Sequence, residues 1–147
     1  MDRKKFINTC SKGCLVVLGG GFSLLQSCTG SHYVTGEFSG SDMVIPLSSF
    51  QTEKKGEASF KKYVIAHHDK LQYLICVYRL SADNFRALLM RCTHQGTELQ
   101  VFGDRLQCPA HGSEFSTTGS VQNGPAETSL RAFPVTIENE NLKINLL

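Results

Sequence analysis

Short apolar segments separated by turn-forming residues run through most of the chain from residue 43 onward. These segments are rich in β-branched and aromatic residues, which favour strands over helices. Turn-forming residues lie between them, as at Ala82-Asp83-Asn84 and Gly103-Asp104. The pattern predicts an all-β fold with mostly antiparallel strands. The expected strands lie in residues 43–47, 63–66, 71–79, 85–91, 99–102, 133–137 and 142–146.

The last of these segments has the clearest periodicity. Residues 142–146 (Leu-Lys-Ile-Asn-Leu) alternate apolar and polar, as a strand does when one face packs on a core and the other meets water. Residues 48–60 differ because they contain the charged cluster Glu-Lys-Lys-Gly-Glu. The sequence leaves open whether they form a short helix or a charged loop.

Residues 1–28 have the organisation of an export signal: a basic start, an apolar run over residues 14–25 that glycines interrupt, and then small or polar residues. The apolar run is shorter than the roughly 20 residues that a helix needs to cross a bilayer. A retained membrane-spanning anchor is therefore the second interpretation. We expect an exported protein that faces the periplasm or the cell exterior.

Residues 25–28 (Leu-Gln-Ser-Cys) resemble a bacterial lipobox, in which the signal is cut before a cysteine that becomes lipidated. On this interpretation Cys28 anchors the protein to a membrane; alternatively, the cysteine merely ends a signal peptide. Residues 2–7 (Asp-Arg-Lys-Lys-Phe-Ile) also resemble a twin-arginine signal, with Lys4 in place of the second arginine. An ordinary basic start, typical of Sec export, is the other interpretation.

Residues 29–42 are rich in Gly, Ser and Thr, which is the composition of a flexible tether. His32 within this segment is interpreted as a solvated linker residue. We expect one folded domain over residues 43–147, because domains of about 100 to 150 residues are common.

The formal net charge of +2 depends on the leader. Arg3, Lys4, Lys5 and Lys12 all precede Cys28, and the positive excess disappears without them. The rest of the chain has no basic stripe, whereas nucleic-acid binding depends on many contacts to phosphates. Nucleic acid is therefore excluded as a partner.

Six cysteines in an exported chain would ordinarily suggest disulfides, but their positions indicate otherwise. Cys10 and Cys14 lie in the leader, and Cys28 is the expected lipidation site. Cys76 lies within an apolar strand segment, where a small buried side chain is expected. Cys92 and Cys108 remain as candidates for metal chemistry.

A histidine follows each of these two cysteines closely, His94 after Cys92 and His111 after Cys108. The segment between the pairs, residues 95–107, predicts a tight β-hairpin, which brings both pairs to one end of the fold. Two thiolates and two imidazoles can bind zinc or an iron-sulfur cluster. A zinc finger pairs like ligands in each loop, whereas in a Rieske centre one iron takes both cysteines and the other both histidines. Here each loop supplies one cysteine and one histidine, which favours an iron-sulfur cluster over a zinc site.

Residues 92–96 (Cys-Thr-His-Gln-Gly) and 108–113 (Cys-Pro-Ala-His-Gly-Ser) resemble the two cluster-binding boxes of the Rieske iron-sulfur family. Residues 124–126 (Gly-Pro-Ala) resemble the proline loop that covers the cluster in respiratory members. The resemblance spans roughly residues 43–147 and implies the Rieske fold, in which small antiparallel sheets carry a cluster-binding subdomain. It implies a 2Fe-2S cluster as cofactor, with the metal ligands Cys92, His94, Cys108 and His111.

Neighbours of these ligands indicate what kind of Rieske centre to expect. Respiratory members join the two loops by a disulfide, and Thr97 and Ala110 stand where its cysteines would be. By the same resemblance, Ser113 tunes the cluster by donating to a sulfide, while Phe115 replaces a tyrosine that donates to a cysteine sulfur. Hydrogen bonds to sulfur favour the reduced state, so the loss of one donor predicts an intermediate reduction potential.

The resulting hypothesis is one-electron transfer by the iron-sulfur subunit of a membrane-associated redox complex, either quinol-oxidising or otherwise periplasmic. The expected partners are redox proteins such as a cytochrome b or c or an oxidoreductase large subunit, with quinol and the membrane as further candidates. The chain itself would be an electron-transfer protein without a catalytic site of its own. The alternatives are a ferredoxin-like component of a Rieske oxygenase system and a zinc-stabilised module without redox activity.

Overall fold

The computed structural model describes residues 32–147. The predicted export signal, with Cys28, and the first residues of the expected tether lie outside the described residues. No helix in the described part of the chain is long and apolar enough to cross a bilayer.

Nearly all regular structure in this part of the chain is strand, with one short 3-10 helix, η2. The elements are β1 (Tyr33–Thr35), β2 (Glu37–Ser39), β3 (Asp42–Pro46), η2 (Leu47–Phe50), β4 (Gln51–Lys54), β5 (Glu57–Phe60), β6 (Tyr63–His67), β7 (Ile75–Arg79), β8 (Phe85–Leu89), β9 (Gln100–Phe102), β10 (Arg105–Gln107), β11 (Glu114–Ser116), β12 (Val121–Asn123), β13 (Ala132–Phe133), β14 (Val135–Glu138) and β15 (Asn141–Asn145).

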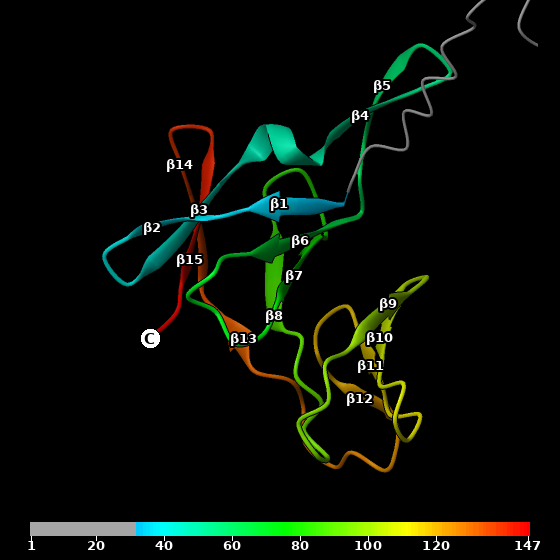
Figure 1. Cartoon of the computed structure of the whole chain (residues 1–147). Helices are drawn as coiled ribbons and strands as arrows, with labels where there is room; N and C mark the ends of the chain where they lie inside the picture. Colours follow the sequence, from blue (N-terminus) through cyan, green and yellow to red (C-terminus); the bar gives the residue numbers. More distant parts are fainter. Residues whose placement is uncertain (1–31) are drawn as a thin grey trace, which may run out of the picture.

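Three small sheets carry the architecture (Figure 1). The central sheet has the strand order β1-β6-β7-β8-β13, and a second sheet has the order β14-β15-β3-β2. The third sheet, β12-β11-β10-β9, forms a separate subdomain at the lower right of Figure 1. The all-β class, with several small and mostly antiparallel sheets, is therefore confirmed.

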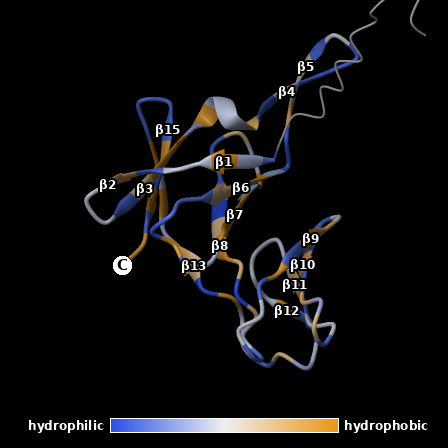
Figure 2. Ribbon diagram, in the orientation of Figure 1, coloured by the Kyte–Doolittle hydropathy of each residue, from blue (hydrophilic) through white to orange (hydrophobic). Residues whose placement is uncertain are grey.

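The central sheet buries both of its faces because its strands alternate between two cores. Val64 and Val77 point to the core shared with the second sheet, where Met43 and Ile144 lie. Figure 2 shows hydrophobic residues where β3 and β15 meet, whereas the projecting β4–β5 hairpin is largely hydrophilic.

The other face of the central sheet holds the third sheet in place. Cys76 and Leu88 on this face belong to one buried cluster with Leu106 of β10 and Phe115 of β11. Cys76 is fully buried, as expected for a small apolar side chain, and burial raises the pKa of its thiol to about 12. Packing across this interface fixes the subdomain against the rest of the molecule.

The prediction of a tether over residues 29–42 is wrong for its described part. β1 pairs in parallel with β6, and β2 pairs antiparallel with β3. His32 is not a solvated linker residue, because its ring stacks on Tyr63 at a centroid distance of 4.3 Å and its Nδ1 lies 3.0 Å from the Tyr63 carbonyl oxygen. Both strands lie at sheet edges, and each only partly buries one apolar side chain, Val34 in β1 and Phe38 in β2, so their composition stays polar.

Residues 48–60 contain most of the short helix η2, one of the two possibilities that the sequence left open. They also contain a β-hairpin that the sequence did not predict. η2 ends at Phe50, and β4 and β5 then pair antiparallel. The turn between them uses Lys55 and Gly56 at φ 54° and 80°, the positive values of a tight hairpin turn. β11 and β12 were also missed, since their Ser- and Thr-rich segment contains no apolar run.

Candidate functional site

The four expected ligands lie in two loops at one end of the third sheet. Cys92 and His94 lie between β8 and β9, and Cys108 and His111 lie between β10 and β11. β9 and β10 pair antiparallel through the predicted turn, with Gln100 opposite Gln107. The hairpin therefore brings the loop that precedes β9 beside the loop that follows β10.

Both loops are closed by backbone hydrogen bonds that begin and end on the cysteine. In the first loop the Cys92 N–H donates to the Thr97 carbonyl at 2.8 Å, and the Gly96 N–H donates to the Cys92 carbonyl at 2.8 Å. In the second, the Cys108 N–H donates to the Ser113 carbonyl at 2.8 Å. Such closure holds each thiol in a defined position without help from a disulfide.

The cysteine thiols and the histidine imidazoles lie in different surroundings, although each loop carries one cysteine and one histidine. Cys92 and Cys108 are 2% and 1% exposed and belong to the same buried cluster. His94 and His111 are exposed, with ring centroids 5.1 Å apart and ring planes at 87°. No group of three or more His, Cys, Asp or Glu residues within 32–147 is placed to hold a single metal ion. A buried thiol pair and an outer imidazole pair fit a cluster with two chemically different irons.

The environment of Cys108 favours the thiolate that a metal requires. Burial by itself would raise the pKa of this thiol, but hydrogen bonds at the backbone of His111 and Ala110 lower it, as do the side chains of Cys92 and Thr97. The net effect is a pKa below the ordinary value for cysteine. Thiolates are both the better nucleophiles and the metal-binding form.

Ser113 links the second ligand loop to the loop that contains Pro125. Its side chain is fully buried, and its Oγ accepts a hydrogen bond from the Ala126 N–H at 3.0 Å. The Gly124-Pro125 peptide is cis. Because this bond uses a lone pair of Oγ, the hydroxyl hydrogen remains able to donate to another acceptor.

Two arginines that lie near the ligand loops in the sequence have different surroundings. Arg105 forms an ion pair with Glu114 at 2.7 Å, so its charge is largely compensated. Arg91 lines a recess of about 590 Å³ beside His94, together with Arg131. Sequence reasoning missed Arg131, since it lies far along the chain and reaches the recess only through the pairing of β13 with β8.

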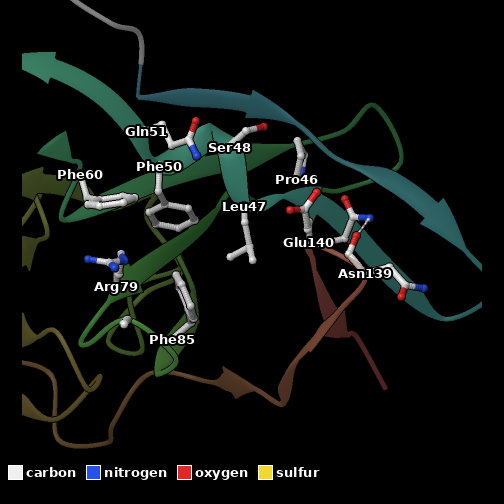
Figure 3. A pocket seen from close by; sticks show the side chains of 12 residues that line it. Pro46, Leu47, Ser48, Phe50, Gln51, Phe60, Arg79, Phe85, Asn139 and Glu140 are labelled. Atoms are coloured by element: carbon white, nitrogen blue, oxygen red, sulfur yellow. Dashed lines mark hydrogen bonds between the residues drawn. The ribbon is translucent and has the colours of Figure 1, made fainter. Parts of the chain in front are cut away.

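A second concave region lies beside η2, the coiled ribbon at the top of Figure 1, away from β9–β12 at the bottom. Figure 3 shows its aromatic wall of Phe50, Phe60 and Phe85, and the Arg79 guanidinium lies 4.2 Å from the centroid of the Phe60 ring. This cleft of about 480 Å³ contains none of the expected ligands. The four expected ligands lie in the ligand loops instead.

Comparison with known families agrees with the chemistry of these loops. Residues 44–134 match the family model of the Rieske [2Fe-2S] domain. The cytochrome b6-f complex iron-sulfur subunit of Synechococcus sp. (strain RCC307) is 38% identical over 56 residues. That match covers 37% of this chain and 32% of the relative. The subunit of Prochlorococcus marinus (strain MIT 9303) is 36% identical over the same length. The match thus spans about a third of these relatives.

A solved structure with a Rieske domain shows the same fold. The quaternary ammonium Rieske monooxygenase CntA, in complex with L-carnitine, superposes with a TM-score of 0.54 at 18% identity, covering 72% of this chain and 32% of that chain. The cyanobacterial plasma membrane Rieske protein PetC3 from Synechocystis PCC 6803 gives a TM-score of 0.49 at 24% identity. This superposition covers 56% of this chain and 85% of the PetC3 chain.

The link between Ser113 and Ala126 can be tested by substitution. Ser113→Ala leaves the buried Ala126 N–H without its acceptor, which should lower the local opening free energy by about 1–3 kcal/mol. Hydrogen exchange of a peptide that contains Ala126, followed by mass spectrometry, measures this change. Ser129→Ala, an exposed change in the same loop, should leave exchange within about 0.5 kcal/mol of the unaltered protein. Equal protection in both variants would contradict the assignment.

Proposed function

Because the chain belongs to the Rieske [2Fe-2S] domain family, we propose that its loops hold a 2Fe-2S cluster through which it passes single electrons. The proposed ligands are Cys92 and Cys108 for one iron, and His94 and His111 for the other. The observation that supports this proposal most strongly is that the two thiols are buried, whereas the two imidazoles are exposed.

The roles of the residues follow from their positions. The bound cluster would supply a one-electron redox couple. Cys92 and Cys108 would hold its inner iron on the side that packs against the protein core, where water is excluded. His94 and His111 would hold the outer iron and present their ring edges to solvent, so a donor or acceptor can approach them closely. Ser113 would donate its free hydroxyl hydrogen to a cluster sulfide.

We place this electron transfer in a membrane-associated redox complex. The curated relatives are subunits of the cytochrome b6-f complex, and the leader with Cys28 predicts export and a lipid anchor. The recess of Arg91 and Arg131 beside His94 offers positive charge to a docking partner. The partner would be a redox protein such as a cytochrome or an oxidoreductase large subunit, with quinol as the candidate small-molecule donor at the imidazole edge.

One observation favours a second candidate, a ferredoxin-like carrier for a Rieske oxygenase system. Thr97 and Ala110 stand where respiratory members have the cysteines of the bridging disulfide, and oxygenase ferredoxins lack that disulfide as well. The two functions differ in their setting, because the carrier would serve an oxygenase whereas the subunit would remain with a membrane complex. Membrane attachment through Cys28 distinguishes them.

Cluster binding predicts the composition and spectrum of the purified protein. We expect two irons and two acid-labile sulfides per chain, and an axial EPR signal on reduction. His111→Ala removes a proposed ligand and should abolish the signal. His68→Ala removes a half-buried histidine outside the ligand loops, whose Nδ1 accepts from the Lys70 N–H and whose ring packs edge-on against Phe38, and should retain it. Stoichiometric zinc without sulfide would contradict redox function and support a structural zinc module.

The membrane setting predicts a dependence on Cys28. The unaltered protein should fractionate with membranes, and mass spectrometry of its mature N-terminus should show an acylated Cys28. Cys28→Ser should release the protein into the soluble fraction, whereas Cys76→Ser should not change its partition. An unmodified N-terminus, or equal membrane partition of the Cys28→Ser variant, would contradict the lipid anchor.

A further inference from the structure

The β4–β5 hairpin is a basic segment on a body that is otherwise acidic. Residues 51–62, which are the hairpin and the two lysines that follow it, contain four lysines and two glutamates, a formal net charge of +2. The other described residues, 32–50 and 63–147, contain seven lysines and arginines against ten aspartates and glutamates, a net charge of −3. Figure 1 shows the hairpin projecting from the molecule, so its positive charge is presented away from the acidic body.

The positive charges of the hairpin are not neutralised within the described part of the chain. Lys54, Lys55 and Lys62 are exposed, and none of them forms an ion pair with a carboxylate of residues 32–147. Glu57 lies opposite Lys54 in the hairpin register, yet their side chains do not reach ion-pair distance. Unpaired cations gathered on one projection fit an anionic surface.

The base of the hairpin lies beside the point at which the chain enters the fold. The His32 ring stacks on Tyr63, which directly follows Lys62, and the His32 carbonyl accepts a hydrogen bond from the Ile65 N–H at 2.7 Å. Cys28 precedes His32 by four residues, which span at most about 14 Å when fully extended. A lipid on Cys28 would therefore hold the base of the hairpin close to a bilayer.

We propose that the β4–β5 hairpin docks on an anionic bilayer through Lys54, Lys55 and Lys62 and thereby orients the lipid-anchored protein. The proposal rests on the lipid anchor at Cys28, which is part of the proposed function. Stable attachment commonly combines an acyl chain with a basic patch, and each lysine near an anionic surface adds attraction. The same surface repels the acidic body, so attraction and repulsion favour one orientation.

This orientation bears on which partner can reach the ligand loops. Figure 1 shows the β4–β5 hairpin at one end of the molecule and β9–β12, which carry the ligand loops, at the other. With the hairpin on the bilayer, the exposed imidazoles of His94 and His111 would face away from the lipid. They would then be accessible to a redox protein on the aqueous side rather than to quinol dissolved in the bilayer.

Acetylation of lysines in the acylated protein, bound to vesicles, tests the orientation. Acetic anhydride is an uncharged reagent, and mass spectrometry reads the rate at each lysine. On vesicles that contain phosphatidylglycerol, Lys54, Lys55 and Lys62 should react about fivefold more slowly than on phosphatidylcholine vesicles. Lys70 and Lys143, which lie over Phe38 of β2 and in β15, should react equally on both. About 1 M NaCl should remove the difference, because salt screens exposed charges.

Two matched double variants separate the effect of charge from the position of the anchor. Lys54→Gln with Lys55→Gln removes two charges from the hairpin and should reduce the protection of Lys62 on phosphatidylglycerol vesicles. Lys70→Gln with Arg86→Gln removes the same charge from exposed sites outside the hairpin, so the protection of Lys62 should persist.

Equal reactivity of the hairpin lysines on both kinds of vesicle, in protein whose Cys28 is acylated, would overturn the inference and leave the anchor intact. Protection that appears only when membrane proteins accompany the lipid would assign the hairpin to an acidic protein and would also overturn it. An unacylated Cys28 would overturn the anchor and this inference together, whereas cluster binding would still be decided by the iron and sulfide content.

Discussion

The site depends on the register of one short hairpin. β9 and β10 pair so that Phe102 faces Arg105 and Gln100 faces Gln107, which sets where the first ligand loop ends and the second begins. Leu106, fully buried in the hairpin, ties this register to the central sheet. A slip by one residue would turn Leu106 toward water, so burial of this side chain and alignment of the loops are maintained together.

Once the loops are aligned, burial distinguishes their thiols from their imidazoles. Cys92 and Cys108 belong to the apolar cluster between the subdomain and the central sheet, whereas His94 and His111 are exposed at the end of the subdomain. A redox centre of this kind is insulated on one side and accessible on the other. The loops achieve this without the disulfide of respiratory members, whose contribution to stability is commonly about 2–4 kcal/mol. Backbone closure around each cysteine takes its place.

The sequence predicted the elements whose signal is local. Apolar runs marked the central strands, and Gly103-Asp104 marked the hairpin between the ligand loops. It failed where pairing gives a polar segment its structure, as in β1 and β2, whose partners β6 and β3 follow later in the chain. The spacing of cysteines and histidines indicated the candidate ligands, but the burial of both thiols and the exposure of both imidazoles depend on packing that no local pattern encodes. Arg131 escaped notice for the same reason.

The central claim is that one iron takes both histidines and the other both cysteines. Pulsed EPR of the reduced protein tests it directly, because nitrogen nuclei bound to iron couple strongly to the unpaired electron. We expect two strongly coupled nitrogens, one of which disappears when His94 or His111 is replaced by cysteine in a variant that retains its cluster. A reduced cluster with no strongly coupled nitrogen, or with two that both persist in either variant, would contradict it.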